Sequence, residues 1–77
     1  MIAVEEAKDN VRVFLKEKVS EDIREASSNG KQEVRVYLDT DFELVEELLG
    51  DIRTRGYKVY LHGIKYTNGY ALDISWK

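Results

Sequence analysis

The feature that most constrains this chain is a five-residue pattern that occurs twice in different surroundings. Val-Arg-Val-Phe-Leu occupies residues 11–15, and Val-Arg-Val-Tyr-Leu occupies residues 34–38. Turn-forming sequences lie on both sides of the second copy, Asn-Gly before it and Asp-Thr-Asp after it. Its apolar residues alternate with polar ones, which is typical of a half-buried strand. We therefore predict a β-strand at 34–38.

The first copy belongs to a longer apolar stripe with helical spacing. Steps of three and four residues keep one face of a helix apolar over about six turns, through Val4, Ala7, Val11, Leu15, Val19, Ile23 and Ala26, with Phe14 beside them. We predict a single helix over residues 4–28, with Gly30 in the left-handed conformation that ends it. The alternative is a strand at 11–15 and a short helix at 21–28, but almost no loop would separate the two.

A second helix is predicted between Thr40 and Gly56. Thr40 and Glu43 have the spacing of a capping box, in which the two side chains satisfy free backbone amides. Acidic residues cluster in the opening turns and basic residues in the last turn, as the helix dipole favours. The predicted buried stripe consists of Val45, Leu48, Leu49 and Ile52, with Leu44 beside it. Gly50 interrupts this helix and is expected to allow a close approach to the first one.

The last part of the chain has the pattern of a β-hairpin. Residues 57–62 and 70–76 alternate between apolar and polar, with an Asn-Gly hairpin turn between them. The apolar positions change parity just before Ile64. We therefore predict a β-bulge near Gly63 and a three-residue loop at 67–69.

These elements, in the order α-β-α-β-β, define an α+β domain. A right-handed crossover through the second helix should make the first two strands parallel and place both helices on one face of the sheet. We predict a three-stranded mixed sheet with two helices packed on one face, in a single domain of residues 1–77. The strand order, 1-2-3 or 1-3-2, stays open.

Composition limits the classes of function. The chain contains no Cys, so neither a disulfide nor a thiolate metal site can stabilise its small core. No apolar run approaches the ~20 residues of a membrane-spanning helix, and the first residues lack the basic region of an export signal. The predicted location is the cytoplasm. The net charge of −3 disfavours general nucleic-acid binding, although residues 52–77 carry 5 bases and 1 acid.

Five short motifs occur along the chain. They are an opening Glu-Glu-Ala-Lys helix, Ile23-x-x-Ala26-x-x-x-Gly30, the alternating segment 34–38, Arg-Gly-Tyr-Lys-Val at 55–59 and Leu-Asp-Ile-Ser-Trp at 72–76. Together they resemble short uncharacterised proteins of bacteriophages and prophages, many of which end in an Ile-Ser-Trp-like strand. The resemblance covers most of the chain and implies this fold and a phage or prophage origin. Its motifs are turns and core positions, so it implies no activity and no site residue.

The best candidate site is the face of the sheet that the helices would leave open. Alternation places there Arg35, Tyr37, Lys58, Tyr60 and His62, together with Asp73 and Ser75. Tyrosine and arginine are enriched at protein contacts, so this face could bind a protein partner or a second copy of the chain. Tyrosines beside Arg and Lys could instead stack single-stranded bases and neutralise phosphates. A third interpretation is a solvated face where side chains pair across strands, for example Asp73 with Lys65 or His62.

No catalytic, metal or cofactor site is predicted, and no small-molecule partner is evident. His62 is the only histidine, and the chain has no Cys nucleophile, Gly-rich phosphate loop or metal-ligand spacing. The acids at 39–43 belong to a helix N-terminus and lack the Gly and distal Glu of a calcium loop. Carboxylates on the helices could imitate a phosphate backbone, but bases such as Lys8 and Arg12 interrupt them. The sequence therefore predicts a small non-enzymatic module that binds protein or, alternatively, nucleic acid.

Overall fold

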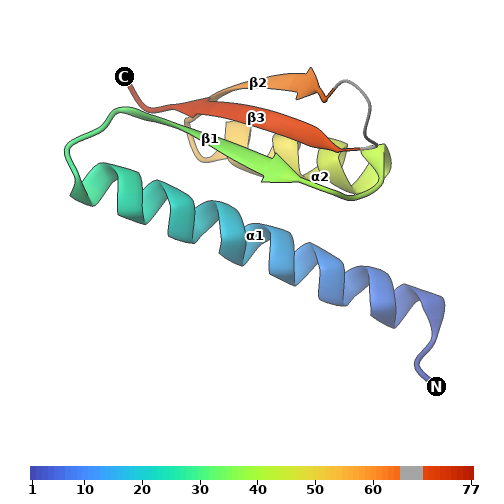
Figure 1. The fold of residues 1–77 in the computed structure, drawn as a ribbon. Coiled ribbons are helices and arrows are strands. Elements are labelled where there is room, and N and C mark those ends of the chain that lie inside the picture. Colours follow the sequence, from blue (N-terminus) through green and yellow to red (C-terminus); the bar gives the residue numbers. More distant parts are fainter. Residues whose placement is uncertain (65–68) are drawn as a thin grey trace.

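The computed structural model describes residues 1–64 and 69–77, which form two helices and three strands. In chain order these are α1 (Val4–Ser28), β1 (Glu33–Leu38), α2 (Phe42–Thr54), β2 (Lys58–Gly63) and β3 (Tyr70–Ser75). Both helices lie against the same face of the sheet, as Figure 1 shows. The predicted α+β class and the predicted order of elements are confirmed.

The sheet is antiparallel throughout, with the strand order β1-β3-β2. Leu72 of the central strand lies opposite Val36 of β1 on one side and Leu61 of β2 on the other. β1 and β2 point in the same direction, as the crossover predicts, but β3 lies between them. The prediction of a mixed sheet is therefore wrong, because none of the described strands has a parallel neighbour.

The repeated pattern forms a helix once and a strand once. Residues 11–15 lie in the middle of α1, whereas residues 34–38 lie in β1. Beyond the end of α1, Gly30 has a φ of 79°. The amide of Gly30 donates to the Ser27 carbonyl and that of Lys31 to the Ala26 carbonyl, both at 3.0 Å. These two bonds make a Schellman motif, so the predicted helix and the way it ends are confirmed.

Only the second half of the α1 stripe is buried. Leu15 and Val19 belong to the core, whereas Val4 is 69% and Phe14 is 62% exposed. A helix of 25 residues is about 37 Å long, whereas a strand of six residues spans about 20 Å. The first turns of α1 therefore project beyond the sheet (Figure 1). The apolar stripe of these turns is therefore left uncovered by the sheet and by α2.

α2 begins without a capping box. Asp41 holds the N-cap position instead of Thr40, and its side chain makes no capping hydrogen bond. The predicted pairing of Thr40 with Glu43 is therefore wrong. Phe42, the first helical residue, packs against Tyr70 at the start of β3, with ring centroids 5.8 Å apart. This aromatic contact with the central strand helps to hold the start of α2 against the sheet.

Gly50 does not bring the two helices together. It is exposed on α2, and a Cβ atom added to it would meet no atom within 4 Å. α2 instead faces α1 with Glu47 and Asp51, which form ion pairs with Arg12 at 2.8 Å and Lys16 at 3.3 Å. The predicted close approach at Gly50 is therefore wrong.

The hairpin of β2 and β3 has no bulge in its described part. Pairing is continuous over the six residues of each strand and ends with Gly63 opposite Tyr70. The Ile64 amide then donates to the Gly69 carbonyl at 3.1 Å, which continues the same pairing. The predicted bulge near Gly63 is therefore wrong. The predicted loop at 67–69 involves residues outside the described part of the chain.

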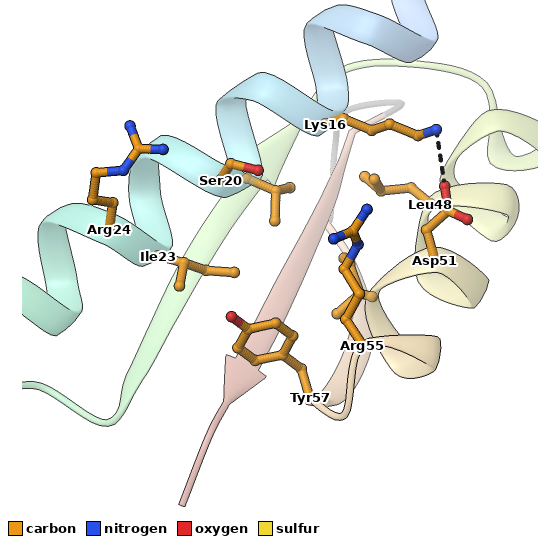
Figure 2. A pocket seen from close by; sticks show the side chains of 10 residues that line it. Lys16, Ser20, Ile23, Arg24, Leu48, Asp51, Arg55 and Tyr57 are labelled. Atoms are coloured by element: carbon orange, nitrogen blue, oxygen red, sulfur yellow. Dashed lines mark ion pairs between the residues drawn. The ribbon is translucent and has the colours of Figure 1, made fainter.

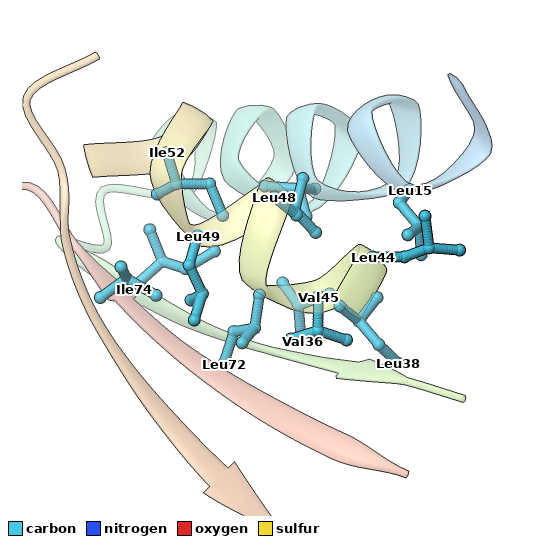
Figure 3. Packing of buried hydrophobic residues seen from close by; sticks show 12 residues of the cluster. Leu15, Val36, Leu38, Leu44, Val45, Leu48, Leu49, Ile52, Leu72 and Ile74 are labelled. Atoms are coloured by element: carbon cyan, nitrogen blue, oxygen red, sulfur yellow. The ribbon is translucent and has the colours of Figure 1, made fainter. Parts of the chain in front are cut away.

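The core lies between the sheet and the two helices. Its most deeply buried side chains, each less than 2% exposed, are Leu72, Ile74, Val36 and Val45. Figure 3 shows α2 side chains packed between the strands and Leu15 of α1. No charged or polar side chain of the described residues is buried. Apolar burial therefore holds the layers together, and the polar residues of the strands lie on the other face of the sheet.

Candidate functional site

The uncovered face of the sheet, which we call the open face, carries the residues predicted for it. Arg35, Tyr37, Lys58, Tyr60 and His62 are exposed, and Asp73 and Ser75 are half-buried. Successive residues of a strand point to opposite faces, so all seven side chains lie opposite the buried Val36, Val59 and Leu72. The structure brings these residues together, and their function stays a prediction.

The register of the three strands determines the surface shape of the open face. Three rows cross it, namely Glu33-Ser75-Lys58, Arg35-Asp73-Tyr60 and Tyr37-Ala71-His62. Long side chains stand on the two edge strands, and short ones follow the central strand. A shallow depression of about 590 Å³ reaches Arg35, Tyr60 and Asp73 from the start of β1, where it is also lined by Ala26, Lys31, Glu33 and Val34. The open face therefore has a ridge of long side chains along each edge strand and, between the ridges, a trough of short ones, which Arg35 and His62 cross to reach Asp73.

Asp73 is the centre of a charged network in this trough. Its carboxylate accepts hydrogen bonds from Arg35 Nε at 2.6 Å and Nη2 at 3.0 Å, and it lies 2.8 Å from His62 Nε2. The hydrogen bonds from Arg35 lower the pKa of Asp73 below its ordinary value, and His62 adds a smaller effect in the same direction. The predicted pairing of Asp73 with His62 is confirmed, whereas the alternative partner Lys65 lies outside the described residues.

This network changes what the open face offers to a partner. Two nitrogens of the Arg35 guanidinium bind Asp73, so much of its charge is balanced within the protein. A phosphate group would have to compete with a carboxylate that is already in place. Tyr37 and Tyr60 remain 59% and 66% exposed. The face therefore suits contact with apolar and aromatic groups better than phosphate binding.

Glu33 is a residue of the open face that sequence reasoning missed. It opens β1, and its carboxylate lies 3.8 Å from Lys77 Nζ. The signal was present, because Glu33 shares its parity with Arg35. The trough could not be found in this way, because it exists only when β3 is the central strand.

A groove between α1 and α2 is a second candidate site, and sequence reasoning missed it too. Its volume is about 350 Å³, and the buried Val19, Leu48 and Ile52 lie among its lining residues. Lys16, Asp51, Arg24 and Arg55 line it as well. In Figure 2 Lys16 is paired with Asp51, the Arg55 guanidinium lies between the helices, and the Arg24 guanidinium points away from Arg55. These residues are far apart in the sequence and meet only because the two helices pack side by side, so no local pattern signals the groove.

The remaining observations concern metals, membranes and known proteins. No group of three His, Cys, Asp or Glu side chains that could hold a metal ion occurs in the described ranges 1–64 and 69–77. Within the same ranges, neither helix has the length and apolar character needed to cross a membrane. Comparisons of the chain with protein-family models, with curated proteins and with solved structures found no match.

Proposed function

We propose that this protein is a small non-enzymatic domain that binds a protein partner through its open face. The observation that carries the proposal is the exposure of Tyr37 and Tyr60 on the two edge strands, while the central Asp73 is already bonded to Arg35. Tyrosine rings that become buried at a contact contribute a large apolar area and a polar tip, and tyrosine is enriched among the residues that dominate binding energy.

A second copy of the same face is the first partner to consider. Two sheets that pack face to face keep their strands within about 30° of each other. In that arrangement the ridge of one copy could lie over the short side chains in the trough of the other. A two-fold symmetric contact needs only such a self-complementary surface. A different protein with an exposed apolar strand or helix would be the other form of partner.

Single-stranded nucleic acid is the alternative ligand of the open face. Stacking of bases would use the same Tyr37 and Tyr60 rings, but phosphate binding also requires available cations. Arg35 is engaged with Asp73, and the chain has a net charge of −3. These two observations favour protein over nucleic acid. The phage or prophage origin stays a prediction from the sequence resemblance.

The first test is the molar mass of the wild type and its variants, measured by light scattering over a range of concentrations. We expect a dimer that Tyr37→Ala and Tyr60→Ala convert to a monomer. Phe14→Ala is the matched control, because Phe14 is similarly exposed but lies on α1. A dimer that Phe14→Ala disrupts and Tyr60→Ala does not would place the contact elsewhere and contradict the proposal.

A monomeric wild type would direct the test to a different protein. The proposal then requires a partner that the wild type and the Phe14→Ala variant retain in a pulldown and that the double variant Tyr37→Ala/Tyr60→Ala loses. Retention by all three would exclude the open face. Salt-sensitive binding to a single-stranded oligonucleotide, lost in Tyr60→Ala and Arg35→Glu, would establish the nucleic-acid alternative instead.

A further inference from the structure

The helical side of the molecule carries the groove between α1 and α2, which is separate from the open face. Charged pairs connect α1 and α2 at intervals of one turn. Arg12 Nε lies 2.8 Å from Glu47, and Lys16 Nζ lies 3.3 Å from Asp51. The step between the two pairs is four residues on both helices, so the helices run parallel. A third pair would lie one turn further along each helix, at the groove described above.

At this third position the pattern changes. Ser20 stands where α1 would present a base, and Arg55, directly after α2, stands where an acid would be expected. Arg24 follows one turn later on α1. Neither the Arg24 guanidinium nor the Arg55 guanidinium forms an ion pair or a hydrogen bond with any residue that the structure describes; the one side-chain bond to Arg24 goes from the Ser27 hydroxyl to its backbone carbonyl. The Arg55 guanidinium therefore stands in the groove without an ion-pair partner among the described residues, and Arg24 lies at its α1 wall, in a chain whose net charge is −3.

Between the two helices the groove has an apolar floor. Val19 and Ile52 are buried beneath it, and the half-buried Tyr57 closes one end (Figure 2). The Tyr57 ring meets Trp76 edge to face, with centroids 6.2 Å apart and an interplanar angle of 87°. The volume of about 350 Å³ is close to the lower limit of small-ligand pockets, about 300 Å³. Such a space suits one ring or a short aliphatic chain.

We infer that this groove binds a small organic carboxylate that carries one apolar group. The Arg55 guanidinium extends into the space between the helices (Figure 2) and offers parallel donors that match a carboxylate. The Ser20 hydroxyl on the opposite wall can donate a further hydrogen bond. The apolar group would then lie against Ile52 and Tyr57. The positive charge of Arg55 favours an anionic ligand. The apolar floor and the small volume of the groove favour a ligand with one apolar group.

The test is a titration with hydrocinnamate, followed by two-dimensional NMR of the backbone amides and by the fluorescence of Trp76. We expect saturable shifts that concentrate at Ser20, Ile52 and Arg55. Hydrocinnamyl alcohol has the same ring without the charge, and we expect it to bind about tenfold more weakly or worse, because hydrogen bonds between charged groups are the stronger ones. Inorganic phosphate has the charge without the ring and should also bind more weakly.

Two arginine variants distinguish direct binding of the ligand by Arg55 from a general effect of the net charge of the protein. Arg55→Leu keeps apolar bulk but removes the guanidinium, so it should weaken hydrocinnamate binding about tenfold or more. Arg53→Leu is the matched control, because Arg53 is an exposed arginine of α2 that does not line the groove. Equal effects of the two variants, equal affinity for the alcohol, or shifts that do not saturate would overturn the inference. If phosphate binds as tightly as hydrocinnamate, the inference that the ligand carries an apolar group is wrong.

Discussion

The Arg35 guanidinium and the Asp73 carboxylate form a two-bond ion pair across β1 and β3, with Nε 2.6 Å from Oδ1 and Nη2 3.0 Å from Oδ2. The two residues are direct neighbours in the strand register. His62 approaches the same carboxylate from β2 at 2.8 Å. One acid on the central strand therefore connects all three strands on the open face, and it limits the charge that this face presents to a partner.

This ion pair should make the stability of the protein depend on pH in the acid range. The pKa of Asp73 is lowered in the folded protein, mainly by the hydrogen bonds from Arg35. The resulting stabilisation is fully present above the unfolded-state pKa, about 3.9, and it is lost as the pH falls through the lower folded-state value. Asp73→Asn should therefore be less stable than the wild type at neutral pH, and the difference should shrink below about pH 4.

Urea unfolding at a series of pH values measures this effect. Glu46→Gln is a suitable control, because Glu46 is exposed on α2 and has no ion pair within the described part of the chain. We expect its stability to differ little from that of the wild type at every pH. A constant difference between Asp73→Asn and the wild type across the acid range would show that the charge of Asp73 has no role.

Gly50→Ala should stabilise the protein by about 0.5–1 kcal/mol, because alanine has the higher helix propensity and restricts the unfolded chain. The added methyl group has no atom within 4 Å to clash with. Gly56→Ala is the control, since the φ of 96° at Gly56 strains any other residue. We expect that control to lose about 1–2 kcal/mol. Thermal unfolding of both variants tests the prediction, and a destabilised Gly50→Ala variant would contradict it.

Leu15 and Phe14 are neighbours in the sequence, but their substitution by alanine should change the stability of the protein by very different amounts. Leu15 is 3% exposed in the core, so Leu15→Ala should cost about 2–5 kcal/mol through lost contacts and a cavity. Phe14 is 62% exposed on α1, so Phe14→Ala should change stability by about 0.5 kcal/mol or less. Chemical denaturation of the two variants measures both values. Similar losses would mean that Phe14 is buried in solution, for example against another molecule.

Asp51→Asn should strengthen carboxylate binding in the groove. Asp51 is the acid of the last charged pair before Arg55, and it lines the groove together with its partner Lys16. Its neutralisation removes repulsion and frees the lysine, so we expect affinity for hydrocinnamate to rise about two- to fivefold, which corresponds to the typical strength of exposed ion pairs. Weaker binding in this variant would indicate that Asp51 itself contacts the ligand.

The parts of the fold with local signals could be predicted from the sequence. Gly30 marks the end of α1 because only glycine takes its conformation without strain. Alternation in β1 placed Arg35 and Tyr37 on the open face because the side-chain period of a strand is two. The same rule found the contact between Asp73 and His62, since both lie on one face of a hairpin.

The remaining features depend on partners that are distant in the sequence. Whether β1 pairs with β2 or with β3 leaves the local pattern of each strand unchanged, so the antiparallel order could not be predicted. Val4 has the same helical spacing as Leu15, and only the length of the sheet decides which of them is covered. The groove has a similar origin, because Ser20 and Arg55 meet only after the helices have packed.

The overhang of α1 divides one continuous helix into two parts with different dynamics. From Val11 and Arg12 onwards the helix is held by the core and by α2, whereas before them it is maintained by its own amide bonds and by neighbours on adjacent turns. Isolated helices of this length are marginal in water. The opening turns should therefore fray and exchange their amide hydrogens rapidly, while the rest of α1 stays protected from exchange. They form a flexible helical extension of an otherwise rigid domain.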